Sequence, residues 1–429
     1  MKNVNMLKIT LISFVFLISG SLYAQQPELQ FYRPNNKYGL NVFEFPKEDT
    51  VAFDGLKVRV GGDFAMQFQM LNQSNDQGNL VDLGSDFNLP SANLKLDVQL
   101  LDGVRMHLTT YLSSRHHAEA WVRGGYLQMD KLNFITPGFL EGVMDYTSIR
   151  IGLDEFNYGD AHFRRSDNAN TIFNPFVGNY IMDAFATEAF GEIYIQGDWF
   201  LGVVGLTNGK LNQNVRLNPN SDNKPSFYGK LGFDEQINPD LRVRLTGSWY
   251  INQGTTTGTW LYGGDRAGAR YYYVLHTTPD ETGATEGGDY EGRYNPRFQK
   301  LTAIQINPFI KFGGLEFFGI LERAMGDAEV QGGTEGEFTQ IAGELLYRFG
   351  MTEEFYIGGR YNMVTGSQLE DAAADLEVTR FNIGGGWFLS KNILTKLEYV
   401  NQQYKGDAWQ GRFAGAEFSG VMVEAAISF

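Results

Sequence analysis

The sequence contains no cysteine, which excludes several kinds of chemistry at once. The chain has no disulfide, no thiol nucleophile, no cysteine-ligated zinc or iron–sulfur cluster, and no lipid-anchoring cysteine after a signal peptide. Basic residues are also scarce, because 35 Lys and Arg stand against 50 Asp and Glu, for a formal net charge of −15. A nucleic-acid partner requires a basic surface, so this balance argues against one.

Long hydrophobic runs are absent after residue 24, so the sequence predicts no transmembrane helix in the exported chain. Residues 1–24 have the pattern of a secretory signal peptide, with Lys2 and Lys8 flanking the start of the apolar run Ile9–Ile18. That run is shorter than the roughly 18 residues needed to cross a membrane. The exported chain is therefore either a soluble secreted protein or a barrel in an outer membrane.

Glycine and aromatic residues are abundant instead, with 51 Gly, 33 Phe, 22 Tyr and 6 Trp, which is high for a soluble enzyme. From Lys57 to Met70 apolar and polar residues alternate strictly. A period of two predicts a strand with one apolar and one polar face. This run is about twice as long as an ordinary globular strand, and it fits a tilted strand that spans a membrane.

The same alternation recurs along the chain and predicts 16 strands. Short turns such as Asp102-Gly103 follow every second strand, with one longer connection at 131–146, and the remaining connections are long and polar. Short periplasmic turns and long extracellular loops are typical of an outer-membrane barrel. The last residues, Val421–Phe429, alternate up to a terminal aromatic residue, which resembles the signal that outer-membrane assembly machinery reads.

We therefore expect an all-β fold, a transmembrane antiparallel β-barrel of about 16 strands over residues 56–429. The barrel has to close, because an open sheet edge in lipid would leave backbone groups without partners. Residues 25–55, which contain Pro27, Pro34 and Pro46, predict an irregular periplasmic N-terminal segment after the signal peptide.

The polar face of such a barrel lines a lumen wide enough for an aqueous channel, unless a loop or plug fills it. Alternation places more cations than acids on this face. A cation on the lipid face costs about 2–4 kcal/mol near the midplane, so inward placement is expected for any function. The cations either form ion pairs with inward acids or leave guanidinium groups free to favour anions. The predicted lumen-lining residues are Lys57, Arg59, Lys95, Arg105, Arg150, Arg242, Arg244, Arg348, Arg360 and Arg380.

The segment 154–184 is predicted to fold into the lumen and narrow it. Its length of about 30 residues exceeds that of a simple connection. Apolar residues at 172–177 are suited to packing against the inner wall, whereas the alternative is a surface loop with solvated charges. The residues predicted at the constriction are Asp160, His162, Arg164, Arg165 and Asp167.

Catalytic, cofactor and metal sites find little support in the sequence. His116, His117 and Glu119 lie close together but lack the spacing of a helical HExxH motif, so they predict incidental surface histidines. The glycines at 384–386 lie within a strand pattern, where they ease curvature or packing. With no GxSxG and no P-loop motif, we expect no enzyme activity, no metal and no cofactor. The tyrosine-rich connection 253–297 is either a recognition surface or a lid over the barrel mouth.

The chain resembles the outer-membrane porins of Bacteroidota and, more distantly, the phosphate-selective porin O and P family. The resemblance is carried by Val58–Phe64, Asn93–Asp97, Leu101–Arg105 and Ser148–Gly152. It implies a 16-stranded barrel, often trimeric, with a pore narrowed by an inward loop. The porin O and P pattern continues with a Pro-Phe-Gly type element where this chain reads Leu153–Gly159. The lysine-rich anion path of that family has no counterpart either, so phosphate selectivity is not carried over.

Together these patterns predict a porin of the Gram-negative outer membrane that lets small hydrophilic solutes or ions diffuse passively through a water-filled barrel, with a weak preference for anions. Its expected contacts are outer-membrane lipid and small hydrophilic solutes or anions. The alternative is a plugged barrel that acts as a binding or scaffold subunit of an outer-membrane assembly or secretion complex. An outer-membrane lipid hydrolase is a third, weaker alternative.

Overall fold

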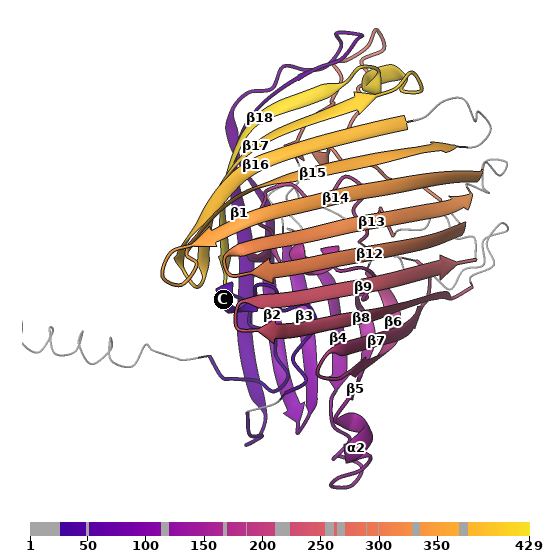
Figure 1. The fold of residues 1–429 in the computed structure, drawn as a ribbon. Helices are drawn as coiled ribbons and strands as arrows, with labels where there is room; N and C mark the ends of the chain where they lie inside the picture. Colours follow the sequence, from indigo (N-terminus) through magenta and orange to yellow (C-terminus); the bar gives the residue numbers. More distant parts are fainter. Residues whose placement is uncertain are drawn as a thin grey trace, which may run out of the picture.

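The structure, a computed structural model, contains one closed barrel of 16 antiparallel strands (Figure 1). This confirms the predicted all-β fold and the predicted number of strands. The residues that the structure describes are 26–48, 51–112, 120–165, 170–185, 187–210, 224–253, 261–263, 271–288, 290–298, 300–327, 335–368 and 376–429.

Each barrel strand pairs with its neighbour along the chain, and the first strand pairs with the last. The strands are β1 (Lys57–Ser74), β2 (Asp86–Leu101), β3 (Val104–Leu112), β4 (Trp121–Met129), β5 (Thr147–Glu155), β6 (Thr187–Gln196), β7 (Phe200–Thr207), β8 (Ser226–Asn238), β9 (Leu241–Asn252), β12 (Lys300–Phe312), β13 (Leu315–Asp327), β14 (Glu335–Phe349), β15 (Phe355–Gln368), β16 (Leu376–Ser390), β17 (Ile393–Lys405) and β18 (Glu417–Ser428). A separate two-stranded sheet, β10 (Tyr271–Tyr272) and β11 (Tyr290–Glu291), interrupts the order, so β9 pairs with β12.

The two faces of the strands have opposite characters, as the period of two predicts. On β1, the outward side chains of Val58 and Val60 are 46% and 44% exposed, whereas the inward Asp63 and Gln67 are each 1% exposed. An outward apolar face and an inward polar face suit a barrel surrounded by lipid. The polar groups on the inner face then require partners inside the barrel.

The barrel closes where β1 meets β18. Their register pairs Asp63 with Ser428, and the backbone amide of Phe429 donates to the carbonyl of Gly62 at 3.0 Å. The amide of Gly62 in turn donates to the carbonyl of Phe429 at 3.3 Å. The sheet therefore has no free edge at this seam, which a membrane-spanning sheet requires because lipid supplies no hydrogen bonds.

Short and long connections alternate, so the barrel has a turn end and a loop end. At the turn end, Asp102-Gly103 joins β2 to β3 and Gly313-Gly314 joins β12 to β13. Gly103 and Gly313 have φ angles of 70° and 53°, which glycine adopts without the strain that a side chain would add. One connection at this end is longer, at 130–146 between β4 and β5.

Helical structure in the described residues is confined to single turns. They are α2 (Glu141–Met144) and the 3-10 helices η1 (Lys37–Gly39), η3 (Ala161–Arg164), η4 (Thr171–Phe173) and η7 (Gly411–Phe413). None of them is long and apolar enough to cross a membrane.

The N-terminal segment runs around the inner wall at the turn end. The side chain of Gln30 donates to Asp102 in the β2–β3 turn at 3.0 Å, and that of Asn35 donates to the carbonyl of Phe429, just after β18, at 3.1 Å. The backbone amide of Lys37 donates to the carbonyl of Lys391 in the β16–β17 turn at 2.8 Å. Asn41 then donates to β13 at 2.8 Å, and Lys47 donates to β5 at 2.8 Å. We call residues 30–48 the N-terminal belt.

The belt almost completes a circle, because the side-chain amide of Gln30 also donates to the carbonyl of Val51 at 2.9 Å. Apart from η1 the belt is irregular. The sequence predicts an irregular periplasmic segment here, and in the structure this segment enters the barrel. An irregular segment has no period from which its contacts can be inferred.

The connection between β5 and β6, which we call the inward loop, fills part of the lumen. Its described residues are 156–165 and 170–185, and all of them are buried except Phe163 and Asn170. Phe173 and Phe176 pack against side chains of β14–β17. The alternative of a solvated surface loop therefore does not hold for these residues.

A charge on the outer face should destabilise the barrel. Leu245 lies near the middle of β9 with 50% of its side chain exposed. We expect Leu245→Lys to lower the free energy of unfolding in lipid vesicles by about 2–4 kcal/mol, because the ammonium group has to enter the bilayer. Urea titration of the reconstituted protein measures this. Leu245→Ala, which removes apolar area without adding charge, is the matched control, and equal losses in both variants would contradict a lipid-facing position.

Candidate functional site

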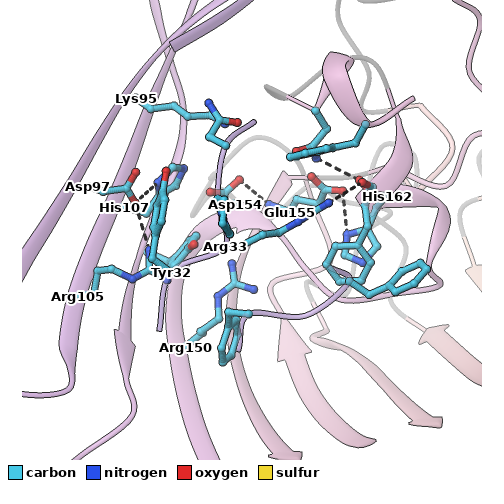
Figure 2. A pocket seen from close by; sticks show the side chains of 18 of the residues that line it. Tyr32, Arg33, Lys95, Asp97, Arg105, His107, Arg150, Asp154, Glu155 and His162 are labelled. Carbon is cyan, nitrogen blue, oxygen red and sulfur yellow. Dashed lines mark hydrogen bonds and ion pairs between the residues drawn. The ribbon is translucent and has the colours of Figure 1, made fainter. Parts of the chain in front are cut away.

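The belt and the inward loop leave a charge-lined cavity of about 170 Å³ against one side of the lumen (Figure 2). Side chains from β2, β3, β4 and β5 form its wall, and the belt and the inward loop form the opposite side. The wall residues are Lys95, Asp97, Arg105, His107, Arg123, Tyr126, Arg150, Asp154 and Glu155. The facing residues are Tyr32, Arg33, Pro34, Asn35, Phe43 and Phe45 of the belt and His162, Phe163, Asn170 and Phe173 of the inward loop.

The wall arginines lie beside carboxylates. Arg105 Nη1 lies 3.1 Å from Asp97 Oδ1. Arg123 lies between Asp154 and Glu155. Its Nη1 lies 3.2 Å from Asp154 Oδ1, and its Nη2 lies 3.2 Å from Glu155 Oε2. Since partly buried pairs are screened less than surface pairs, these groups hold one another in fixed orientations at the cavity wall.

Lys95 and Arg150 have partners deeper in the wall. Lys95 Nζ lies 3.4 Å from Asp63 Oδ2, and Arg150 Nη1 lies 2.7 Å from Glu192 Oε1. The guanidinium carbon of Arg150 also lies 3.8 Å from the ring centroid of Tyr126, which is a close cation–π contact. Both cations therefore border the cavity while the acids that balance them stay behind the surface.

Two histidines take part in the same network. His107 Nδ1 lies 2.8 Å from Asp97 Oδ1, and its Nε2 lies 2.8 Å from Thr109 Oγ1. His162 Nδ1 lies 3.0 Å from Glu155 Oε1 (Figure 2). Each imidazole is thus held by a carboxylate at the cavity, and no group of three or more metal-ligating side chains occurs in the described part of the chain.

Arg33 of the belt differs from the wall cations, because no carboxylate lies within ion-pair distance of it among the described residues. Its guanidinium stacks over the ring of Phe173 at 4.1 Å and donates to the carbonyls of Gly39 at 3.0 Å and Phe163 at 3.3 Å. Burial lowers the pKa of Arg33 to about 9, so the side chain keeps its charge at neutral pH. The cavity therefore contains one cation that carbonyls and rings hold without neutralising it.

Asp160, predicted at the constriction, lies instead in a buried ion-pair cluster at the wall. Its carboxylate lies 2.8 Å from Lys230 Nζ on β8 and 2.8 Å from Arg244 Nε on β9. Burial alone would raise the pKa of Asp160, but the two cations hold it well below its usual range. Asp160 therefore fixes the inward loop to the wall and does not border the cavity.

Arg164 is an anchor of the same kind, whereas Arg165 is paired within the inward loop. Arg164 lies between Glu316 of β13 and Glu344 of β14, at 2.9 Å from each, and Arg165 pairs with Asp183 within the loop. Neither borders the cavity. The prediction that these charges line the constriction did not allow for the wall acids that pair with Arg164 or for the loop acid that pairs with Arg165. Of the predicted constriction residues, His162 borders the cavity, and Asp167 lies outside the described residues.

The predicted lumen-lining cations all lie on inward strand positions, but only some face open space. Lys95, Arg105 and Arg150 border the cavity. Lys57 pairs with Asp54 at 2.9 Å on the turn-end rim. The guanidinium carbon of Arg59 lies 5.2 Å from the ring centroid of the belt residue Tyr32.

Most of the remaining predicted cations hold the belt or the inward loop. Arg242 Nη1 donates to the carbonyl of Asn41 at 2.8 Å, and Arg244 Nη1 lies 2.8 Å from Glu44. Arg348 donates to Glu316 and Arg360 to Glu344. Arg380 donates to Gln402 and to the backbone carbonyls of Asn179 and Gly292. Most inward cations are therefore paired, which was one of the two alternatives left open above.

Two of the cations at the cavity, Arg123 and Arg33, were not among the predicted lumen-lining residues. Arg123 lies at an irregularity of the ladder, because the register between β3 and β4 shifts between Thr109 and Thr110. Such a bulge breaks the period of two, and alternation therefore left the facing of this strand ambiguous. Arg33 lies in the irregular belt, where no local signal indicates an inward position.

Two tyrosines of the connection between β9 and β12 have hydroxyl groups that reach the inner wall. The hydroxyl of Tyr262 donates to Glu322 at 2.8 Å, beside the hydroxyl of Tyr158 from the inward loop. The hydroxyl of Tyr271 donates to Glu398 at 2.9 Å. These contacts tie the described part of the connection between β9 and β12 to the inner wall, and we call this part the lid. His116, His117 and Glu119 lie outside the described residues.

Comparison with known proteins gives a likeness of fold. The sequence matches no protein-family model and no curated protein sequence. An anion-selective porin from Comamonas acidovorans matches the structure with a TM-score of 0.54 at 12% identity, over 87% of this chain and 100% of that one. The fold is that of the outer-membrane porins. The outer membrane channel DcaP of Acinetobacter baumannii matches with a TM-score of 0.53 at 11% identity, over 88% and 99% of the two chains. The trimer form of OmpT of Vibrio cholerae matches with a TM-score of 0.52 at 12% identity, over 88% of this chain and 100% of that one.

Removing the charge of Asp160 should weaken the attachment of the inward loop. We expect Asp160→Asn to lower the free energy of unfolding by about 3–5 kcal/mol, because Lys230 and Arg244 would lose their shared buried partner. In the unchanged protein this stabilisation is complete above about pH 4 and is lost as the pH falls further, because the folded-state pKa lies below the unfolded value. Asp198→Asn, at an exposed turn, is the control. Equal urea midpoints for the two variants would contradict the anchoring role.

Proposed function

We propose that this protein is an outer-membrane porin through which small hydrophilic solutes or ions diffuse passively, and that they pass through the cavity against β2–β5. The observation that carries the proposal is a polar, charge-lined cavity inside a closed barrel whose outer face is apolar. Fixed charges at a narrow part of a pore act on passing ions at short range, where water screens them least. No chemical step is required of any residue.

The charges around the cavity support a weak preference for anions. Five cations border it against three acids, with the acids that pair with Lys95 and Arg150 behind the wall, and Arg33 has no acidic partner within ion-pair distance among the described residues. An unneutralised guanidinium lowers the energy of an anion nearby and raises that of a cation. One solved neighbour of the same fold is an anion-selective porin. The cations are Arg33, Lys95, Arg105, Arg123 and Arg150, and the acids are Asp97, Asp154 and Glu155.

The proposal includes the location and assembly of the protein. Residues 1–24 direct export, the turn end faces the periplasm, and the loop end faces the exterior, as in barrels with this alternation of connections. A trimer form is described for one structural neighbour, which supports a homotrimer here. Membership of the Bacteroidota porins stays a prediction from the resemblance.

A second candidate function is the plugged barrel that serves as a scaffold or binding subunit. The observation that favours it is that three segments fill much of the lumen. The belt, the inward loop and the lid are all held inside the lumen by hydrogen bonds to the wall. A scaffold barrel would carry no current when reconstituted alone.

Neutralising Arg33 should shift ion selectivity. We expect Arg33→Gln to lower the anion-to-cation permeability ratio by roughly two- to threefold, because the cavity loses its unneutralised cation. The reversal potential in a salt gradient across a planar bilayer measures the ratio. Arg323→Gln removes the same charge from an exposed position on β13 and should leave the ratio unchanged. If both variants keep the ratio of the unchanged protein, Arg33 does not govern selectivity.

Removing the belt should widen the passage. We expect deletion of residues 30–48 to raise the single-channel conductance roughly twofold or more, because the belt occupies the turn-end mouth of a barrel whose lumen is wide enough for water. Heat-dependent gel migration checks that the shortened chain still forms a barrel. Glu44→Gln, which removes the ion pair with Arg244, is a milder variant for the same recording. A silent full-length protein with a conducting deletion variant would favour the plugged barrel, and silence in both would sink the porin.

A further inference from the structure

The connection between β4 and β5 differs from the other turn-end connections, and we call residues 131–146 the apolar projection. It lies beyond the ends of β4 and β5 and carries the single turn α2 outside the barrel wall (Figure 1). The side chains of Lys131 and Asn133 fix its base to Asp102 of the β2–β3 turn, at 3.0 and 2.8 Å. The projection is therefore held in place at its root.

The projection exposes large apolar side chains. Phe134 and Ile135 are 51% and 56% exposed, and Leu140, Val143 and Tyr146 are 51%, 54% and 54% exposed. Exposed apolar groups of this kind mark a surface that binds another apolar surface, because the exposure of apolar groups to water is unfavourable in free energy. This surface has no cover in the described residues.

The exposed surface is continuous with the outward face of the barrel. The carbonyl of Tyr146 accepts from the amide of Gln196 at 2.8 Å, at the turn end of β6. Ile195 beside it is 46% exposed, Trp199 in the next turn is 55% exposed, and Ile151 on β5 is 54% exposed. The apolar outward face of β5–β7 therefore adjoins the projection, and the exposed Asp145 and Asp198 are the acids at this junction.

The polar groups of the projection are separated from its apolar ones. Glu141 and Asp145 are exposed and four residues apart, which places both on one side of α2, whereas Val143 lies on another. An apolar side and an acidic side suit the boundary between acyl chains and headgroups, with the acids toward water. Acids at this level repel anionic headgroups and favour a zwitterionic lipid.

We propose that the apolar projection is a membrane-docking surface that inserts into the headgroup and acyl boundary of the lipid leaflet at the turn end, in contact with zwitterionic glycerophospholipid. This rests on the membrane placement in the proposed function. The continuity with the outward face of β5–β7 selects lipid as the occupant, because that face already borders the bilayer. A second copy of the chain and a periplasmic protein are the competing occupants.

The absence of cysteine allows a direct test by single-site spin labelling in phosphatidylcholine vesicles. The labelled variants are Val143→Cys on the projection, Ile151→Cys on the outward face of β5, and Glu281→Cys on an exposed loop. The measurement compares collision rates with oxygen, which enters lipid, and with a water-soluble nickel complex. We expect the oxygen-to-nickel ratio at 143 to exceed that at 281 by about fivefold and to stay below that at 151, as for an interfacial site.

The outcomes separate the occupants. A ratio at 143 equal to that at 281, with 151 in lipid, would overturn the docking surface while leaving the porin intact. An aqueous ratio at 151 as well would refute the membrane placement itself. Dipolar broadening of the label at 143 at a low protein-to-lipid ratio would identify a second copy as the occupant and overturn the lipid proposal. Phe134→Cys repeats the measurement at a second position, so a folding failure of one variant leaves the test complete.

Discussion

The hydrogen-bond ladder between β1 and β18 is the interaction on which the other features of this protein depend. It joins the ends of a 16-stranded sheet, so that no backbone edge faces lipid. Closure also creates an inside, and the alternation of the strands places the polar residues there. Those polar residues, buried but without bulk water around most of them, then require partners from the rest of the chain.

The partners come from three segments that enter the lumen. The belt supplies Asn41 and Glu44, the inward loop supplies Asp160 and Arg164, and the lid supplies Tyr262. Breaking one side of such buried pairs is costly, whereas the net stability of an intact pair is small. The network therefore contributes specificity, because it fixes which part of the lumen is filled and leaves the cavity against β2–β5 open.

The barrel could be predicted from the sequence because neighbouring residues determine each strand. The cavity could not be predicted, because contacts between residues far apart in the chain determine it. A period of two indicates each strand from a few neighbouring residues, and the terminal alternation to Phe429 indicates the last one. By contrast, Asp160 meets Lys230 and Arg244 across 70 and 84 residues of chain. Inward charges could be assigned to the lumen, but their pairing depends on the path of the loop. Arg33 lies in an irregular segment, where no local pattern indicates its position.

The contact between Asn35 and the seam of the barrel has a consequence for the order of assembly. The side-chain amide of Asn35 donates to the carbonyl of Phe429 at 3.1 Å and lies 3.4 Å from the carbonyl of Gly62. These two carbonyls come together only when the first and last strands have met. The belt precedes β1 in the chain, but this contact forms only after β18 has been synthesised and has paired with β1. The finished lumen is therefore a late product of biogenesis, because the N-terminal segment can settle fully only inside a wall that has already closed.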